Sequence, residues 1–195
     1  MTALPKEKKY TPAEYLVLEE KAETRSEYWN GEIVAIAGGN INHQQIVANF
    51  TEFLGAKIRG KCRVFPSEMK VWFKKRGKFF YPDLTVICDK PNFYKTRRDT
   101  IDNLRLIIEV LSKSTASFDR GEKFLSYQSL ESLQEYVLVS QEKAVVEQHI
   151  KREDGNWIYQ ARIGLESAVT FPSLGATLSL NEIYDLVEFE TEGNL

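Results

Sequence analysis

The sequence has very few of the residues that most often carry metal or covalent chemistry. It holds two cysteines and two histidines among 195 residues. Cys62 and Cys88 do not have the spacing of zinc ligands, and two cysteines cannot build a disulfide framework. We therefore expect no structural zinc site and a reducing, cytoplasmic environment.

Long apolar runs and glycine-rich phosphate loops are missing as well. No stretch approaches the roughly 20 apolar residues that span a bilayer, and the start, MTALPKEKKY, lacks the apolar segment of a secretory signal. Neither a G-x-G-x-x-G nor a G-K-S/T string occurs, and there is no G-x-S-x-G nucleophile elbow. These absences predict a soluble protein with no membrane partner and no organic cofactor, and they disfavour serine or thiol catalysis.

The charge is unevenly distributed although the net charge is only −2. Nine lysines and arginines lie between Lys57 and Lys78, against the single acidic residue Glu68, so the remainder of the chain is acidic. A basic patch on an acidic protein indicates a surface that faces a polyanion. The alternative is a lysine-rich hairpin edge that discourages aggregation.

Turn and capping signals divide the chain into short elements. Thr11, Pro12 and Glu14 predict a helix start, and Asn30-Gly31 predicts a hairpin turn. A helix is expected to follow, with Asn42 as its cap and Gly60 at its end. Strands are expected at 62–73 and 78–89, joined by KKRG, and then at 104–112 and 135–140, with a helix between the last two.

A hairpin at 144–163 and a short strand and helix complete the pattern, with no internal repeat and no long linker. This order predicts an α/β or α+β fold with a mixed sheet flanked by helices. We interpret residues 1–195 as one domain, with a core at about 25–150 and a C-terminal hairpin and short helix at 144–190.

Two carboxylates stand where the neighbouring residues predict a dry environment. Glu109 interrupts the apolar strand LRLIIEVLS, and Asp83 follows Pro82 at the start of the apolar strand LTVIC. Buried carboxylates are costly unless they are paired, hydrogen-bonded or bound to a cation. Mg²⁺, or Mn²⁺ in its place, is suited to one or two such carboxylates and can activate water toward a phosphodiester.

The blocks YPDLTVIC, LIIEVLS, DRGEKFLSYQSL and EYVLVS resemble the Uma-two family of restriction-endonuclease-like proteins, within the PD-(D/E)XK nuclease superfamily. YWNGEIVAIAGG and NHQQIVANF extend the resemblance, so that it covers about residues 10 to 185. It implies a restriction-endonuclease-like fold.

The resemblance also implies the site residues. Asp83 matches the Asp of the PD motif and Glu109 the second acid, and a backbone carbonyl near Val110 is expected as a further metal ligand. The lysine of the superfamily usually stands two residues after the second acid, where this chain has Leu111. Lys123, on the following helix, matches the lysine instead.

Other residues are second candidates or have simpler explanations. Lys113, on the Glu109 face of the strand by its period of two, is the alternative lysine. Glu32 and His43 match family blocks, although an exposed hairpin glutamate and a capping or packing histidine are the simpler explanations. Asp83 could cap a turn, Glu109 could pair with Arg105 or Lys123, and Lys123 could be solvated.

The leading hypothesis is a Mg²⁺-dependent endonuclease that cuts DNA, with a homodimer expected because cutting two strands suits twofold symmetry. Contacts to backbone phosphates are expected from the basic hairpin residues Lys70, Lys74, Lys75, Arg76 and Lys78. The alternatives are a catalytically inactive nucleic-acid-binding protein of the same fold and a structural or assembly partner.

Overall fold

Thr11 and Glu14 set the start of the first helix in the computed structural model, which describes residues 8–36 and 38–190. The Glu14 amide donates to the Thr11 hydroxyl, and the Thr11 amide donates to the Glu14 carboxylate, which is the capping box that the sequence predicts. Helix α1 spans Pro12–Glu19. The predicted hairpin follows as β1 (Ser26–Trp29) and β2 (Glu32–Ala35), with Asn30 and Gly31 both at positive φ in the turn.

The two long strands expected around KKRG each divide into two shorter ones. The first gives β3 (Arg63–Pro66) and β4 (Lys70–Phe73), and the second gives β5 (Lys78–Phe80) and β6 (Leu84–Ile87). Strands β4 and β5 pair in one sheet, whereas β3 and β6 pair in another. The second break contains Pro82, which has no N–H to give to a strand ladder. Asp83 therefore lies at the junction of the two sheets.

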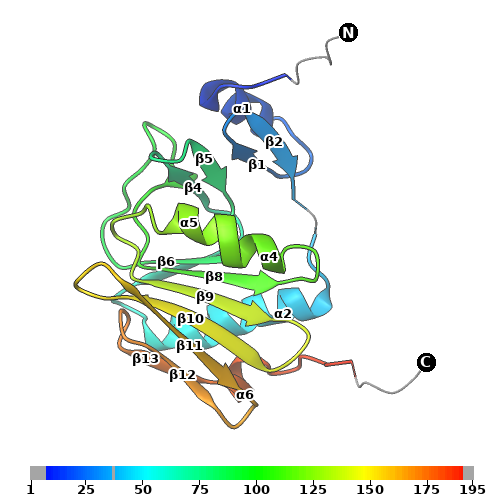
Figure 1. Cartoon of the computed structure of the whole chain (residues 1–195), viewed down its shortest axis with the longest axis vertical. Coiled ribbons are helices and arrows are strands. Elements are labelled where there is room, and N and C mark those ends of the chain that lie inside the picture. Colours follow the sequence, from blue (N-terminus) through cyan, green and yellow to red (C-terminus); the bar gives the residue numbers. More distant parts are fainter. Residues whose placement is uncertain (1–7, 37, 191–195) are drawn as a thin grey trace.

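The two main sheets differ in size and position (Figure 1). The smaller has the order β2-β1-β5-β4-β7, where β7 is Thr100–Ile101. The larger has the order β11-β10-β9-β8-β6-β3 and adds the strands β8 (Leu106–Leu111), β9 (Glu135–Ser140), β10 (Val145–Lys151) and β11 (Trp157–Ile163). Only β8 and β9 pair in parallel in the larger sheet. A parallel pair needs a crossover, here the helical segment α4 (Ala116–Phe118), η2 (Asp119–Lys123) and α5 (Phe124–Tyr127).

The larger sheet is covered on both faces, which explains the unbroken apolar pattern of β8. Successive residues of β8 enter different cores: Ile108 packs with Phe50 and Leu54 on one side, and Ile107 packs with Tyr127 on the other. The first core contains the helical segment α2 (Ile41–Asn49), η1 (Phe50–Leu54) and α3 (Gly55–Lys57).

The predicted ends of that segment were wrong by a few residues. Asn40, not Asn42, caps α2 by accepting a hydrogen bond from the His43 amide, and the last turn ends at Lys57 rather than at Gly60. The Asn42 side chain instead donates to the backbone carbonyls of Gln141 and Glu188. Asn42 therefore ties the start of α2 to the C-terminal part of the chain.

The C-terminal part forms β12 (Ala168–Phe171), β13 (Ala176–Ser179) and α6 (Leu180–Ile183). The first two pair as a small antiparallel sheet. Phe171, Leu178 and Ile183 join the same core cluster as Phe50. This part of the chain therefore packs against the larger sheet and shares its core.

Cys62 and Cys88 are joined by a disulfide bond, a pairing that their number alone did not predict. Cys62 precedes β3 and Cys88 follows β6, and the register that pairs Arg63 with Ile87 places the two cysteines opposite each other. Their Cα atoms are 4.0 Å apart. The cysteines therefore give no support to the expectation of a reducing compartment.

Within residues 8–36 and 38–190, every helix is too short or too polar to cross a membrane.

Candidate active site

Glu109 is buried in the middle of β8, and Lys123 supplies the positive charge that its environment requires. The Lys123 Nζ lies 2.9 Å from Glu109 Oε1, and both side chains are less than a tenth exposed. The Tyr127 hydroxyl donates a short hydrogen bond to the same oxygen. Lys123 and Tyr127 come from the crossover helix, so a lysine on the helix does reach the acid on the strand. A π-helical turn carries Lys123, a local geometry that is frequent at functional sites.

Two further buried acids surround the same ammonium group. Asp119 Oδ1 lies 3.5 Å and Glu27 Oε1 3.6 Å from the Lys123 Nζ. Glu27 is fixed by hydrogen bonds from the Tyr81 amide (3.3 Å) and from the Trp29 indole N–H (3.1 Å). Three carboxylates from β1, β8 and the crossover helix therefore share one lysine.

Asp83 lies beside this group, at the break between β5 and β6. Its Oδ2 accepts a hydrogen bond from the Val110 amide at 2.8 Å, and the His43 Nε2 lies 3.2 Å from the same oxygen. Because Leu84 is paired with Ile108, the antiparallel register places Asp83 across from Glu109. The Asp83 side chain is 22% exposed, which makes it the most accessible carboxylate of the four.

Burial and neighbouring charges shift the pKa of Glu109 and the pKa of Lys123. Burial raises the pKa of Glu109 well above its ordinary value, and the charges of Asp83 and Asp119 add to this effect. Burial opposes the charge of Lys123, but Glu109, Glu27 and Asp119 outweigh it and raise the pKa of Lys123.

Asp83 and His43 stabilise each other's charged forms. Burial works against the ionised form of Asp83, but the hydrogen bond and the charge of His43 outweigh it, so that the pKa of Asp83 is lowered. Burial likewise disfavours the charged form of His43, and the hydrogen bond to Asp83 reverses this and raises the pKa of His43. His43 is thus in contact with a candidate metal ligand, not only a packing residue.

Lys113 and Glu32 are exposed, and Val110 contacts Asp83 through its backbone amide. Lys113 follows the end of β8, has an 80% exposed side chain and pairs with Glu142 at 3.5 Å, so it does not join Glu109. Glu32 is exposed at the start of β2. At Val110 the structure shows the amide bound to Asp83, whereas the expected role of a nearby carbonyl stays a prediction.

The basic hairpin is partly neutralised by acids of the same chain. Lys70 is buried beside Asp99, and Lys78, with a side chain 12% exposed, lies 3.6 Å from Glu122. The exposed members of the predicted patch are Lys74, Lys75 and Arg76, of which Lys75 pairs with Glu131. A phosphate-binding surface formed by all five residues is therefore not what the structure presents.

Sequence reasoning missed Glu27, Asp119 and Tyr127. Glu27 could have been found by the argument used for Glu109, because it stands next to Tyr28 and Trp29 in a strand. Asp119 is four residues before Lys123, the spacing that places two side chains on one face of a helix. The contact of Tyr127 depends on packing between the helix and β8, and no local pattern indicates it.

The carboxylates of the cluster suit a hard divalent cation, although they do not form a complete set of metal ligands. In the part of the chain that the structure describes, no three acidic, histidine or cysteine side chains are arranged to hold a metal ion together. Four carboxylates nevertheless face one lysine and one histidine, so the cluster is short of positive charge. Mg²⁺ commonly takes only one or two protein carboxylates and fills its shell with water and phosphate oxygens. The residues present therefore fit such an ion.

Comparison with known proteins identifies the family of the chain. Residues 12–181 match the model of the Uma2 family, which is described as "Putative restriction endonuclease". The chain belongs to the Uma2 family. All of the clustered residues, from Glu27 to Lys123, lie within the matched range.

The chain is also similar to two proteins of Synechocystis sp. (strain ATCC 27184 / PCC 6803 / Kazusa) and to one solved structure. "Uncharacterized protein sll1609" is 37% identical over 83% of this chain and 92% of that protein, and "Uncharacterized protein slr1290" is 34% identical over 90% and 92%. The crystal structure of a protein described as a putative nuclease belonging to DUF820, from Anabaena variabilis ATCC 29413, superposes with a TM-score of 0.76. It has 18% identity and covers 92% of this chain and 99% of its own. This Uma2 chain has the restriction-endonuclease-like fold that its sequence predicted.

Proposed function

We propose that this protein is a metal-dependent endonuclease that hydrolyses phosphodiester bonds of DNA. The observation that carries the proposal is the convergence of three carboxylates, from separate parts of the chain, on a single buried lysine, with a fourth carboxylate, Asp83, opposite Glu109 in the sheet register. An excess of negative charge of this kind is unstable in an apolar core unless a cation completes it. Membership in the Uma2 family supports the same conclusion.

Each residue has a distinct role in this proposal. Asp83 and Glu109 would hold Mg²⁺ or Mn²⁺, a cation that supplies positive charge to polarise the phosphodiester and to make water more acidic. Asp83 is accessible, and its Oδ2 is held in place by Val110 and His43, so its position is fixed before any ligand arrives. Lys123 provides the fixed positive charge that offsets negative charge built up at the phosphorus.

The test compares Asp83→Asn and Glu109→Gln with the wild type on supercoiled plasmid DNA in the presence of Mg²⁺ or Mn²⁺. Each variant should cut at least about 100-fold more slowly, because a lost ligand removes several kcal/mol of charge stabilisation. Direct Mn²⁺ binding, measured by electron paramagnetic resonance, should weaken in parallel.

Asp89→Asn is the matched control for this test. Asp89 is 70% exposed and pairs with Arg105 beyond the far end of β6, so its loss should change neither cleavage nor Mn²⁺ affinity. Equal cleavage by all four proteins, or cleavage that proceeds in a chelator, would contradict the proposal.

A second candidate is a nucleic-acid-binding protein that keeps the fold without the chemistry. It is favoured by the 2.9 Å pair of Lys123 and Glu109, which neutralises the second acid without a metal. Such a protein should bind DNA but show no Mn²⁺ affinity that depends on Asp83. The Mn²⁺ titration therefore separates the two candidates.

DNA contacts and a homodimer are further parts of the proposal. Lys74 and Arg76 are the exposed hairpin residues with which no acid of the described chain pairs, and they are the best placed to meet backbone phosphates. A homodimer stays a prediction, and light scattering of the full chain in the presence of duplex DNA would test it.

A further inference from the structure

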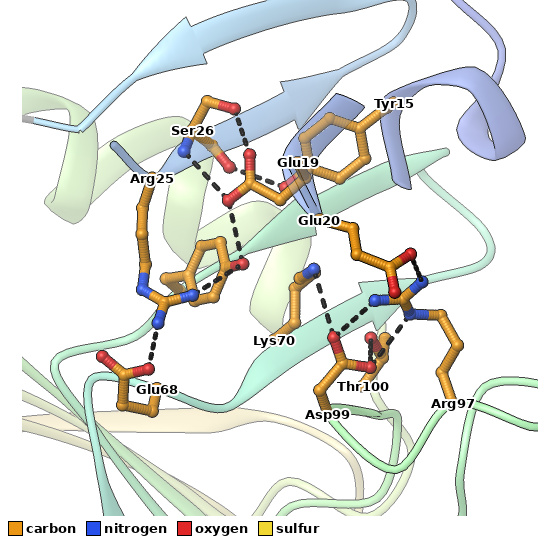
Figure 2. A network of polar contacts seen from close by, with 11 residues as sticks. Tyr15, Glu19, Glu20, Arg25, Ser26, Glu68, Lys70, Arg97, Asp99 and Thr100 are labelled. Carbon is orange, nitrogen blue, oxygen red and sulfur yellow. Dashed lines mark hydrogen bonds and ion pairs between the residues drawn. The ribbon is translucent and has the colours of Figure 1, made fainter. Parts of the chain in front are cut away.

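A second polar site lies on the α1 side of the smaller sheet, in a cavity of about 740 Å³. Its walls come from the end of α1, the loop before β1, the start of β4 and the loop before β7. Figure 2 shows Lys70 in the middle of this site, between Arg25 on one side and Arg97 on the other. None of these three residues belongs to the acid cluster around Lys123.

Lys70 is a buried cation whose hydrogen-bonding capacity is largely unused. Its side chain is 3% exposed, and among the described residues its ammonium group makes one hydrogen bond, to Asp99 Oδ2 at 3.5 Å. Both oxygens of Asp99 are already taken by Arg97, at 2.9 and 2.7 Å. An ammonium group has three donors, and burying them without acceptors is costly. The pKa of Lys70 is accordingly lowered by burial.

Each of the two arginines at the sides of the cavity contacts one largely exposed acid. Arg25 stacks on the Tyr81 ring and contacts Glu68, whose side chain is 73% exposed. Arg97 contacts Glu20, which is 69% exposed, at 3.6 Å. A phosphate group can replace a carboxylate on a guanidinium group, because both present oxygens to its two parallel N–H donors. An incoming phosphate would therefore displace exposed side chains without disturbing buried ones.

The cavity is joined to the acid cluster through Tyr81. The Tyr81 amide donates to Glu27 of the cluster, while its hydroxyl donates to Glu19 and accepts from Arg25 in the cavity. Tyr81 is two residues before Asp83, so their Cα atoms are at most about 7 Å apart. Ser67, next to Glu68, also donates to the Asp83 carbonyl.

We propose that this cavity binds a backbone phosphate of the nucleic-acid strand that is cut at Asp83. Arg25 and Lys70 bind the phosphate oxygens, and Glu68 swings into solvent. The proposal rests on the proposed function for the kind of ligand, because the nearness of the cavity to Asp83 is what selects a strand rather than another anion. The site positions the strand and does not read its sequence.

The test measures binding, not cleavage, so that it stands apart from the proposed function. A fluorescent single-stranded oligonucleotide is titrated with wild type, Arg25→Gln and Glu68→Gln in a chelating buffer at several salt concentrations. Arg25→Gln should weaken binding about five- to tenfold, since one charge-assisted contact is lost. It should also reduce the salt slope by about 0.7, the value for one phosphate on a single strand.

Glu68→Gln should act in the opposite direction and tighten binding, because it frees Arg25 from its competitor. A purely structural ion pair predicts instead that both substitutions lower thermal stability and change affinity with the same sign. The pair Arg152 and Asp154, exposed in the turn between β10 and β11, is the control for net charge. Arg152→Gln and Asp154→Asn alter the charge equally and should leave affinity unchanged.

Three results would overturn the inference. The first is an unchanged oligonucleotide affinity in Arg25→Gln, and the second is a change of affinity with the same sign in Arg25→Gln and Glu68→Gln. The third is a change of affinity in Arg152→Gln and Asp154→Asn as large as in the cavity variants. Titration with inorganic phosphate and with a mononucleotide identifies the source of the ligand. Tight binding of either one that depends on Arg25, together with unchanged oligonucleotide affinity, would assign the cavity to a free phosphate and refute the strand. If the wild type shows the expected oligonucleotide binding but no Mg²⁺-dependent cleavage, the proposed function is refuted and the binding of a strand in this cavity is not.

Discussion

The ammonium nitrogen of Lys123 lies 2.9 Å from the carboxylate of Glu109, and neither side chain reaches solvent to any useful extent. A buried pair of this kind gains little net stability, because both charges lose their hydration. Glu27 and Asp119 increase the excess of negative charge, since they add two carboxylates around the same lysine. The arrangement is therefore better explained by a functional need for charge than by a need for stability.

Replacing Lys123 by methionine should expose this imbalance. Removal of one partner from a buried pair typically costs about 3–5 kcal/mol of unfolding free energy. In Lys123→Met the loss should be smaller at acidic pH, because the raised pKa of Glu109 lets it take up a proton and lose its charge. Urea unfolding of the variant and of the wild type at pH 5 and pH 8 measures the difference in unfolding free energy. This difference should be smaller at pH 5.

Mg²⁺ provides the second readout for the same variant. The ion should stabilise Lys123→Met more than it stabilises the wild type, because it supplies the missing positive charge. An unfolding midpoint that responds equally to Mg²⁺ in both proteins would show that the acids do not form a cation site.

Glu27 should contribute to cation affinity although sequence reasoning did not select it. Its carboxylate is 3.6 Å from the Lys123 Nζ and is fixed by the Tyr81 amide. Glu27→Gln removes one negative charge at nearly constant shape, and we expect Mn²⁺ to bind about tenfold more weakly. Glu32→Gln, on the same hairpin but exposed, is the matched control and should bind Mn²⁺ as the wild type does. Identical affinities for the two variants would remove Glu27 from the site.

Much of the fold was predictable because its signals are local. The capping box at Thr11, the Asn30-Gly31 turn and the apolar pattern of β8 each specify one element by themselves. The breaks within the strands 62–73 and 78–89 were not predictable in full. Pro82 indicated an interruption, but the transfer of each strand from one sheet to another depends on packing of the whole chain.

In the candidate site, too, residues with a local sequence signal were predictable, and residues placed by tertiary packing were not. Asp83 and Glu109 were found because a carboxylate among apolar neighbours needs an explanation, and the Lys123 contact followed from a resemblance over spaced blocks. Lys113 was selected by the period of two, which fails because β8 ends at Leu111 and the chain turns away. Lys70 was read as part of a basic surface, but its burial beside Asp99 is set by tertiary contacts.

Asp99 should make the stability of the protein depend on pH in the acid range. Its hydrogen bonds from Arg97 and the charge of Lys70 lower the pKa of Asp99 from 3.8 to about 2. A lowered pKa means that the stabilising contribution is complete above about pH 4 and is lost as the pH falls toward 2. The difference in unfolding free energy between wild type and Asp99→Asn should therefore be largest above pH 4 and vanish near pH 2. Urea unfolding at intervals of half a pH unit measures it, and a difference that stays constant down to pH 2 would contradict the assignment.

The bond between Cys62 and Cys88 should be present in the purified protein and should stabilise it. It closes a loop with a sequence separation of 26 residues, for which the loss of chain entropy in the unfolded state is worth about 3–4 kcal/mol. The double variant Cys62→Ala/Cys88→Ala should unfold at a lower temperature, and a reductant should lower the midpoint of the wild type while leaving the double variant unchanged. Thiol titration of the unfolded wild type, prepared without reductant, should find no free thiol. Two free thiols, or a reductant effect of the same size in both proteins, would show that the cysteines are not bonded in solution.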